Sequence, residues 1–218
     1  MATTVSMTNI VANNGKGWFP AQRGNCAWQL SSITPGDGAA SSIKIIPSGA
    51  GEVTLTSAAH DLVASHKYYV TFKIRFEAAV TGTCDWYWPI AEPAAAANIA
   101  VNAAAGAWTR LSAVFDRTSF SDGSYYCRFD YNNNDGNNRT FWFTSCMLID
   151  LTAAFGAGKE PSKDWMDTHV TEFSDAPSAH YIDNLDELFA GISSAIQAKS
   201  GQPGKIFACD FIDKILAL

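Results

Sequence analysis

The chain has 218 residues, which suits one domain of ordinary size or one domain with an appendage. Charged residues make up only 17% and aromatic residues 12%, a balance that favours a β-rich protein that packs against partners or presents rings to a ligand. The formal net charge is −6 and no run of Lys and Arg occurs, which excludes nucleic acid as a partner because phosphate binding needs clustered cations.

The cysteines indicate reduced thiols. The chain has five of them, an odd number without Cys-x-x-Cys spacing, so we expect neither a disulfide scaffold nor a zinc knuckle. Thiols that stay reduced suggest folding in a cytosol. The first residues lack the charged start and apolar core of a signal peptide, and no run of ~20 apolar residues predicts insertion into a membrane.

Short strands are predicted along the first 150 residues. Residues 66–77 give the clearest pattern, because apolar side chains alternate with a second set that includes Lys73 and Arg75. Residues 139–151 are apolar on both faces and are expected to form a central strand. The predicted strands are 3–11, 26–33, 41–47, 52–57, 66–77, 84–90, 98–102, 107–115, 124–131 and 139–151.

This many short antiparallel strands predict a mainly β fold, an antiparallel β-sandwich (jelly roll) over residues 1–170. After a linker at 171–182, apolar side chains recur at helical spacing, which predicts a two-helix appendage over residues 183–218. Helices this short are marginal in water, so their apolar stripes are expected to form an assembly contact. The residues of that contact are Leu188, Phe189, Ile192, Ile196, Phe211 and Ile215.

Residues 147–167, MLIDLTAAFGAGKEPSKDWMD, mark the change from strands to helices. Gly156 and Gly158 can take positive φ cheaply, and Pro161 suits the first turn of a short helix over 162–166. The stretch resembles a signature of tail and other virion proteins of bacteriophages, where it closes a jelly roll similar to carbohydrate-binding modules. The resemblance covers roughly residues 9–170 and includes HKYYVTF (66–72), AWTRLS (107–112) and RFD (128–130).

A second resemblance lies at the C-terminus. AIQAKSG (195–201) and the residues from 206 to 215 are similar to a short helical module of phage tail proteins. Both resemblances imply a virion structural component of the tail, baseplate or capsid surface, assembled in the host cytoplasm. They imply other virion proteins as partners and a homo-oligomer. Neither implies an enzyme, and no residue is assigned a catalytic role.

A glycan-binding surface is predicted around residues 84–90. Jelly rolls that bind sugars use flat aromatic faces for CH surfaces and planar polar groups for hydroxyls. The ligand would be a cell-surface or mucosal glycan. The alternative is that these rings are packing or a subunit interface, because Trp86 and Trp88 share one face of their strand. The candidate residues are Asp85, Trp86, Tyr87, Trp88, Trp108, Arg128, Asp130 and Asn132.

Metal sites are not expected, and no cofactor is assigned. Asp130, Asn132 and Asn134 have the spacing that begins a calcium loop, but an EF-hand needs Gly at position 135 and an acid near 141. The chain has Asp135 and Phe141 there, so we expect a hairpin turn at residues 135–136. A calcium site of another geometry stays an alternative. The four histidines lack the spacing of zinc ligands.

Two function hypotheses follow from the sequence. In the first, the sandwich binds surface glycans for a phage particle. In the second, the chain is a capsid or tail decoration protein without a ligand. A glycosidase is not expected, because no spacing in the sequence pairs two carboxylates across a cleft. Burial of Trp86, Tyr87 and Trp88 would remove the main support of the glycan hypothesis.

Overall fold

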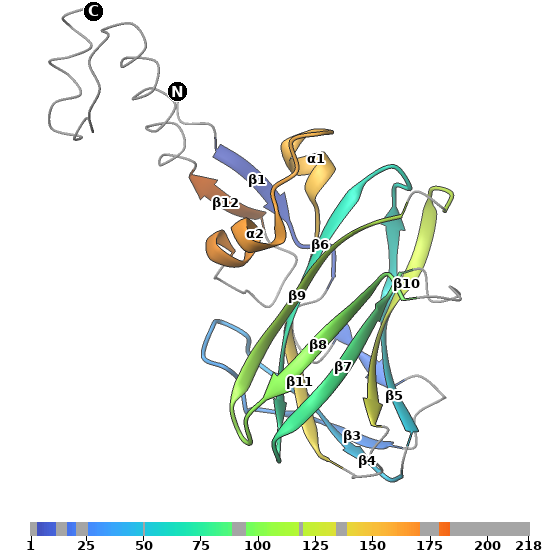
Figure 1. The fold of residues 1–218 in the computed structure, drawn as a ribbon, viewed down its shortest axis with the longest axis vertical. Helices are drawn as coiled ribbons and strands as arrows, with labels where there is room; N and C mark the ends of the chain where they lie inside the picture. The colour runs from blue at the N-terminus through green and yellow to red at the C-terminus, as the bar shows by residue number, and fades with distance from the viewer. Residues whose placement is uncertain are drawn as a thin grey trace, which may run out of the picture. The chain divides into compact units, whose positions relative to one another are not determined.

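The computed structural model describes residues 4–11, 17–20, 26–49, 51–88, 95–117, 120–133, 139–170 and 179–183. The chain divides into two compact units, Met7–His180 and a second one made of Met1–Ser6 with Tyr181–Leu218. The first unit contains the β-sandwich (Figure 1). The predicted appendage at 183–218, apart from residue 183, lies outside the described residues and stays a prediction, and so does the turn at 135–136.

Two five-stranded sheets build the sandwich, and every registered strand pair in them is antiparallel. We name each sheet after its middle strand. The β10 sheet has the order β2 (Phe19–Pro20), β5 (Gly51–Leu62), β10 (Gly123–Asn133), β7 (Val80–Tyr87) and β8 (Ala97–Ala103). The β11 sheet has the order β3 (Cys26–Ser31), β4 (Ser42–Pro47), β11 (Phe141–Asp150), β6 (Lys67–Phe76) and β9 (Trp108–Asp116).

The predicted antiparallel β-sandwich is therefore confirmed. Each strand predicted between residues 26 and 151 is present with shifted ends, and β11 is central, as its two apolar faces indicated. The sequence missed β2 and also β12 (Ala179–Asp183), which pairs with β1 (Thr4–Thr8) in a two-stranded sheet. Two-residue strands have too few positions to show a period of two. Within the described residues, no helix has the length and apolar character to span a membrane.

The core is a cluster of aromatic rings from both sheets. Phe72 of β6 lies 5.0 Å from Phe129 and 6.2 Å from Trp86, both in the opposite sheet. Trp18 fills one side, with ring centroids 5.6 Å from Trp86 and 5.1 Å from Phe143. Edge-to-face and offset pairs at these separations are favourable beyond their burial. The buried cysteines Cys84, Cys127 and Cys146 pack in the same core as small apolar side chains, as predicted.

Strand β11 is buried on both faces, so other parts of the chain must shield its outer face from solvent. A bulge between Thr144 and Met147 places Ser145 at φ 53°. The side chain of the buried Asn9 forms hydrogen bonds with the backbone groups of β11 at this bulge. Its amide donates to Cys146 O (3.1 Å), and its Oδ1 accepts from Leu148 N (2.9 Å). Trp142 is buried on the outer face, because its neighbours 141 and 143 take the core positions.

Two short helices follow β11 directly. The strand was expected to run to Leu151, but Asp150 accepts a hydrogen bond from Ala153 N (2.8 Å) and starts α1 (Leu151–Phe155) instead. Gly156 and Gly158 then take positive φ, as predicted. Ser162 caps α2 (Lys163–His169) through Trp165 N (3.2 Å). The ring of Trp165 packs edge-on against Phe155, with 5.6 Å between the ring centroids, and so joins α2 to α1.

We expect Asn9→Ala to destabilise the sandwich by about 1–3 kcal/mol, the usual cost of leaving buried backbone groups unpaired. Chemical unfolding followed by tryptophan fluorescence measures this loss. Asn102→Ala is the matched control, because residue 102 is exposed on β8, and it should stay within about 0.5 kcal/mol of the parent. Equal stability of the two variants would contradict the role given to Asn9.

Candidate functional site

Two of the predicted ligand-binding rings lie in the core. Trp86 and Trp88 are 0% exposed, and Trp88 Nε1 donates to Tyr125 O (3.1 Å) inside the protein. The prediction that they meet a glycan is therefore corrected. The reason is alternation along the strand: Trp86 shares the inward face of β7 with Cys84, and Trp88, directly after β7, keeps the same parity and also belongs to the core.

The other face of the same strands brings four predicted residues together. Arg128 of β10 is the cross-strand partner of Tyr87 on β7, and Asp130 is the partner of Asp85. Their side chains point away from the core, because the alternating neighbours Cys127 and Phe129 point into it. We call this surface the tyrosine face, made of Asp85, Tyr87, Asn98, Tyr126, Arg128 and Asp130.

Planar groups stack and pair on the tyrosine face. The Arg128 guanidinium lies 3.8 Å from the centroid of the Tyr87 ring and holds one side of it. Its Nη2 atom is 2.8 Å from Asp130 Oδ2. The amide of Asn98, on the edge strand β8, donates to Asp85 Oδ1 at 2.6 Å. These contacts fix the polar groups before any ligand arrives, which lowers the entropy cost of binding.

Asp130 is the electrostatic centre of the tyrosine face. It is fully buried, and this desolvation raises the pKa of its carboxyl from 3.8 to about 7. The positive charge of Arg128 opposes the rise, and the carboxylate of Glu52 adds to it. The carboxyl of Asp130 therefore holds its proton more tightly than an exposed aspartate does.

Tyr126 is a residue that the sequence analysis left out of the candidate set. It lies on β10 with the parity of Arg128 and Asp130, and 54% of it is exposed. Its ring is the most exposed aromatic surface on the tyrosine face. The signal was present in the alternation of residues 124–131, which already put Tyr126 on the polar side. The neighbouring Tyr125 has the opposite parity and packs against the core.

Two further candidates do not join this group. Trp108 lies on β9 in the other sheet, on the outer face, so its predicted place in the glycan cluster is corrected. The error arose because sequence spacing cannot tell which sheet a strand enters. Asn132 belongs to β10, but its side chain lies outside the described part, and so does Asn134 of the calcium alternative.

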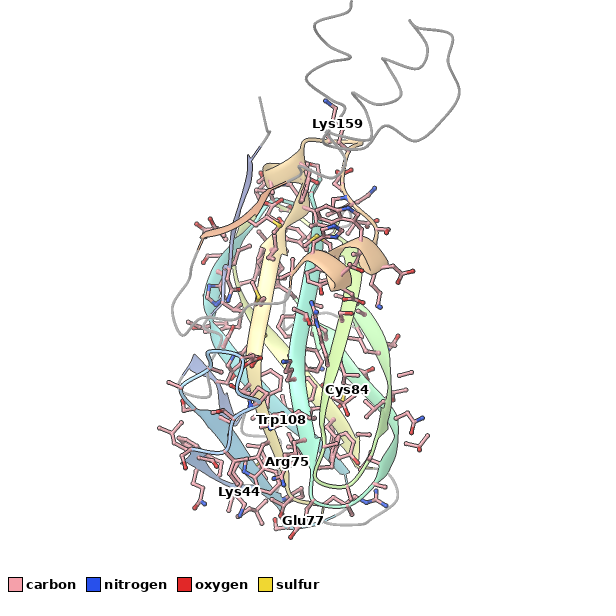
Figure 2. The ribbon with its side chains drawn as sticks, turned by 90° about the vertical axis from the view of Figure 1, so that its left-hand side faces the viewer. Lys44, Arg75, Glu77, Cys84, Trp108 and Lys159 are labelled. Carbon is pink, nitrogen blue, oxygen red and sulfur yellow. The ribbon has the colours of Figure 1, made fainter. Side chains whose placement is uncertain are left out.

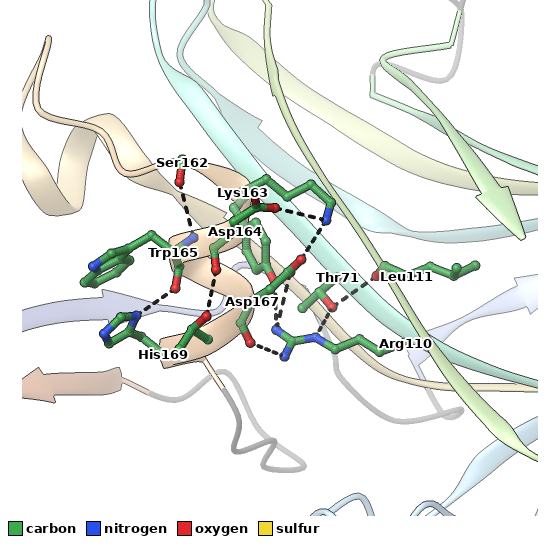
Figure 3. Close-up of polar contacts among 11 residues, drawn as sticks. Thr71, Arg110, Leu111, Ser162, Lys163, Asp164, Trp165, Asp167 and His169 are labelled. Carbon is green, nitrogen blue, oxygen red and sulfur yellow. Dashed lines mark hydrogen bonds and ion pairs between the residues drawn. The ribbon is translucent and has the colours of Figure 1, made fainter.

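A second polar cluster fastens α2 to the β11 sheet. Arg110 donates through Nη2 to the Tyr69 hydroxyl (2.6 Å) and through Nη1 to Asp167 O (2.9 Å) (Figure 3). Tyr69 in turn donates to Asp167 Oδ1 (2.7 Å), and Lys163 reaches Oδ2 of the same carboxylate (2.7 Å). An open groove of about 630 Å³ lies beside this cluster, with Asn98 on its wall. Because Arg110 and Asp167 bind each other there, we assign the cluster to anchoring α2.

The carboxylates near the tyrosine face do not form a hydrolytic pair. Asp85 and Asp130 are cross-strand partners, which the sequence spacing did not indicate. Asp85 is only 8% exposed and accepts from Asn98, while Asp130 is buried against Arg128. A glycosidase instead needs two carboxyls facing each other across a bound sugar. Among the residues described, no group of three or more His, Cys, Asp and Glu is placed to hold a metal ion.

Comparison with known proteins shows similarity of fold. No protein-family model and no curated protein matches the chain. An arabinose-bound α-L-arabinofuranosidase aligns with a TM-score of 0.51 at 12% identity, over 67% of this chain and 26% of that one. The chain thus spans about a quarter of that enzyme's length. At this identity the likeness concerns the β-sandwich alone.

Two other solved structures align at lower scores. A carbohydrate-binding module of Cellvibrio mixtus lichenase 5A in complex with cellotriose has a TM-score of 0.47 at 14% identity, over 65% of this chain and 98% of that one. The enzymatically active domain of tailspike protein 4 from bacteriophage CBA120 has a TM-score of 0.45 at 14% identity, over 65% of this chain and 21% of that one.

We expect Asp130 to make the sandwich less stable as pH rises from about 4 to about 7. Its pKa is higher in the folded chain, about 7 against 3.8, so folding favours the protonated form and this contribution is lost as pH rises through that window. Asp130→Asn replaces the titrating carboxyl group with a neutral amide of nearly the same size. Melting temperatures of parent and variant should converge near pH 4 and separate by pH 8, with the variant higher. A constant difference across pH would contradict the raised pKa.

Proposed function

We propose that the sandwich is a glycan-binding module, and that its ligand contacts the tyrosine face. The observation that carries this proposal is the exposed Tyr126 ring on the same sheet face as the planar polar groups of Arg128, Asp85 and Asn98. Rings bind the CH surfaces of sugars, and paired planar groups bind their hydroxyls. Tyr87, already covered on one side by Arg128, adds polar contacts through its edge. The arrangement suits binding without catalysis, because the carboxylates of Asp130 and Asp85 are already engaged by Arg128 and Asn98.

We further propose that the chain belongs to a bacteriophage particle and works there with other virion proteins. The support is the resemblance of residues 147–167 and of the C-terminal residues to phage tail proteins. The predicted contact at Leu188, Phe189, Ile192, Ile196, Phe211 and Ile215 would join it to the particle. The sandwich would then meet cell-surface or mucosal glycans, and the chain would assemble in the host cytoplasm.

A second candidate function, a structural protein without a ligand, is favoured by the edge strand β3. Trp28 and Leu30 are 46% and 48% exposed. Ile33, which follows them in the chain, is also exposed, and so is Ile46, the cross-strand partner of residue 27. In the described part, these four are all the exposed large apolar side chains except Tyr126. Strand β3 has no charged residue to discourage pairing, so subunits can pack here.

We expect Tyr126→Ala to weaken glycan binding about tenfold, which corresponds to about 1.4 kcal/mol from a lost stacking ring. A glycan array with the full chain would identify a ligand, and titration calorimetry with that ligand would measure the change. Tyr126→Phe should bind like the parent if the ring face is what counts. Trp28→Ala is the control on the other sheet. An array without any binding would refute the glycan function.

We expect Trp28→Glu to lower the oligomeric state of the purified chain, because it places a charge in the apolar patch of β3. Sedimentation velocity at several concentrations measures the effect. The same variant should keep glycan binding, since β3 lies in the sheet opposite the tyrosine face. A parent chain that is monomeric at every concentration would contradict packing of copies through β3.

A further inference from the structure

Cations on the outer face of the β11 sheet fall into two groups. Lys73 Nζ lies 2.8 Å from Asp37 Oδ2, and Arg110 contacts Asp167, so these two are neutralised by the loop before β4 and by α2. Within the part of the chain that is described, Lys44 and Arg75 have no carboxylate at ion-pair distance, and each lies over Trp142 instead. Positive charge therefore remains at one end of this face.

These two cations belong to a row that crosses four strands. The register pairs Lys44 on β4 with Trp142 on β11, Trp142 with Arg75 on β6, and Arg75 with Trp108 on β9. We call Lys44, Trp142, Arg75 and Trp108 the basic row. Figure 2 shows Lys44, Arg75 and Trp108 close together near one end of the sheet, with Lys159 at the other end. With neighbouring strands about 4.8 Å apart, the row is about 14 Å long.

The basic row is held in place before a ligand arrives. Lys44 Nζ is 5.4 Å and Arg75 Cζ is 4.7 Å from the centroid of the Trp142 ring, which they leave only 6% exposed. Arg75 Nε also donates to Gly106 O (2.8 Å), which fixes the position of the guanidinium. Side chains fixed in this way lose less entropy when they bind an anion.

We propose that the basic row binds an acidic polysaccharide. Carboxylate or sulfate groups would lie on Lys44 and Arg75, and one sugar ring would lie on the half-buried Trp108. The guanidinium of Arg75 suits two oxygens of one anionic group, and an indole face suits the CH side of a sugar. A row of about 14 Å that offers two charges and then the half-buried ring of Trp108 fits a chain of sugars better than a single small ion.

This site lies on the sheet opposite the tyrosine face, so the inference does not rest on the function proposed for that face. The nearest acidic residue along β6 is the exposed Glu77, with the same parity as Arg75. It makes no ion pair in the described part of the chain, and its charge opposes an anionic ligand. Removing that charge should strengthen binding, and this gives the test a change in the opposite direction.

The test uses the full chain with three polysaccharides at about 50 mM and about 300 mM salt, because screening weakens contacts between exposed charges. Polygalacturonate offers carboxylates, dextran sulfate offers sulfates, and neutral dextran is the control. We expect binding of one or both acidic chains at low salt and none of dextran. Binding of polygalacturonate alone would assign the ligand's anionic group as a carboxylate, and binding of dextran sulfate alone would assign it as a sulfate. Absence of binding to both would overturn the proposal.

Variants then locate the site. Lys44→Gln with Arg75→Gln should weaken binding about tenfold or more, the scale of hydrogen bonds to charged groups. Glu77→Gln should strengthen binding. Lys159→Gln removes one exposed charge at the other end of the sheet and should bind like the parent. An equal loss with Lys159→Gln would mean unspecific attraction and would overturn the proposal.

Two further measurements keep the outcome clear. If the variant with Arg75→Gln fails to fold, the double variant Arg75→Lys with Lys44→Gln replaces it, because Lys retains the charge at position 75. Trp108→Ala tests the contribution of the ring. We expect weaker binding from the double variant and from Trp108→Ala. Tyr126→Ala should leave acidic chains bound, which separates this site from the tyrosine face. Stronger retention of a single-stranded DNA oligonucleotide than of either polysaccharide would replace the proposed ligand class with nucleic acid and overturn the inference.

Discussion

The structure depends on the burial of β11 on both of its faces. Its inner side chains contact rings of the other sheet, as Phe143 does with Phe129, and its outer side chains must be shielded by other parts of the chain. Different parts of the chain provide that cover: Asn9 at the bulge, Asp37 in the loop before β4, and Trp142 shielded by its own cationic neighbours. The helix α2 is instead anchored on the neighbouring strands of the same sheet, through Arg110 of β9 and Tyr69 of β6.

The outer faces of the two sheets differ in charge as a result. On the β11 sheet the covering segments bring Asp37 and Asp167, which neutralise Lys73 and Arg110, whereas Lys44 and Arg75 of the basic row have no carboxylate at ion-pair distance among the described residues. On the β10 sheet Asp130 pairs with Arg128, which stacks on Tyr87, and Asp85 lies opposite Asp130 and accepts from Asn98. One sandwich thus offers two surfaces of different chemistry, both built on strands, whose positions are more rigid than those of loops.

The two functions weighed for this protein use different parts of it. Ligand binding uses the strand faces, where rings and planar groups are held by cross-strand contacts such as Arg128 on Tyr87. Assembly uses the apolar edge at β3, where Trp28 and Leu30 are exposed. A subunit that packs through its edge keeps both sheet faces free for ligands, so the two functions are compatible in one particle.

The class of fold and the place of its middle strand could be predicted from the sequence, because a period of two and the doubly apolar run at 139–151 depend only on the local order of residues. The sequence also separated Tyr126, Arg128 and Asp130 from the core. It did not determine which strands lie side by side, since antiparallel pairing joins residues far apart in the chain. Only the tertiary structure decided that Trp86 and Trp88 are buried, that Asp85 meets Asp130, and that Trp108 lies beside Arg75. Those neighbours are set by packing between sheets, where shape and burial outweigh local preference.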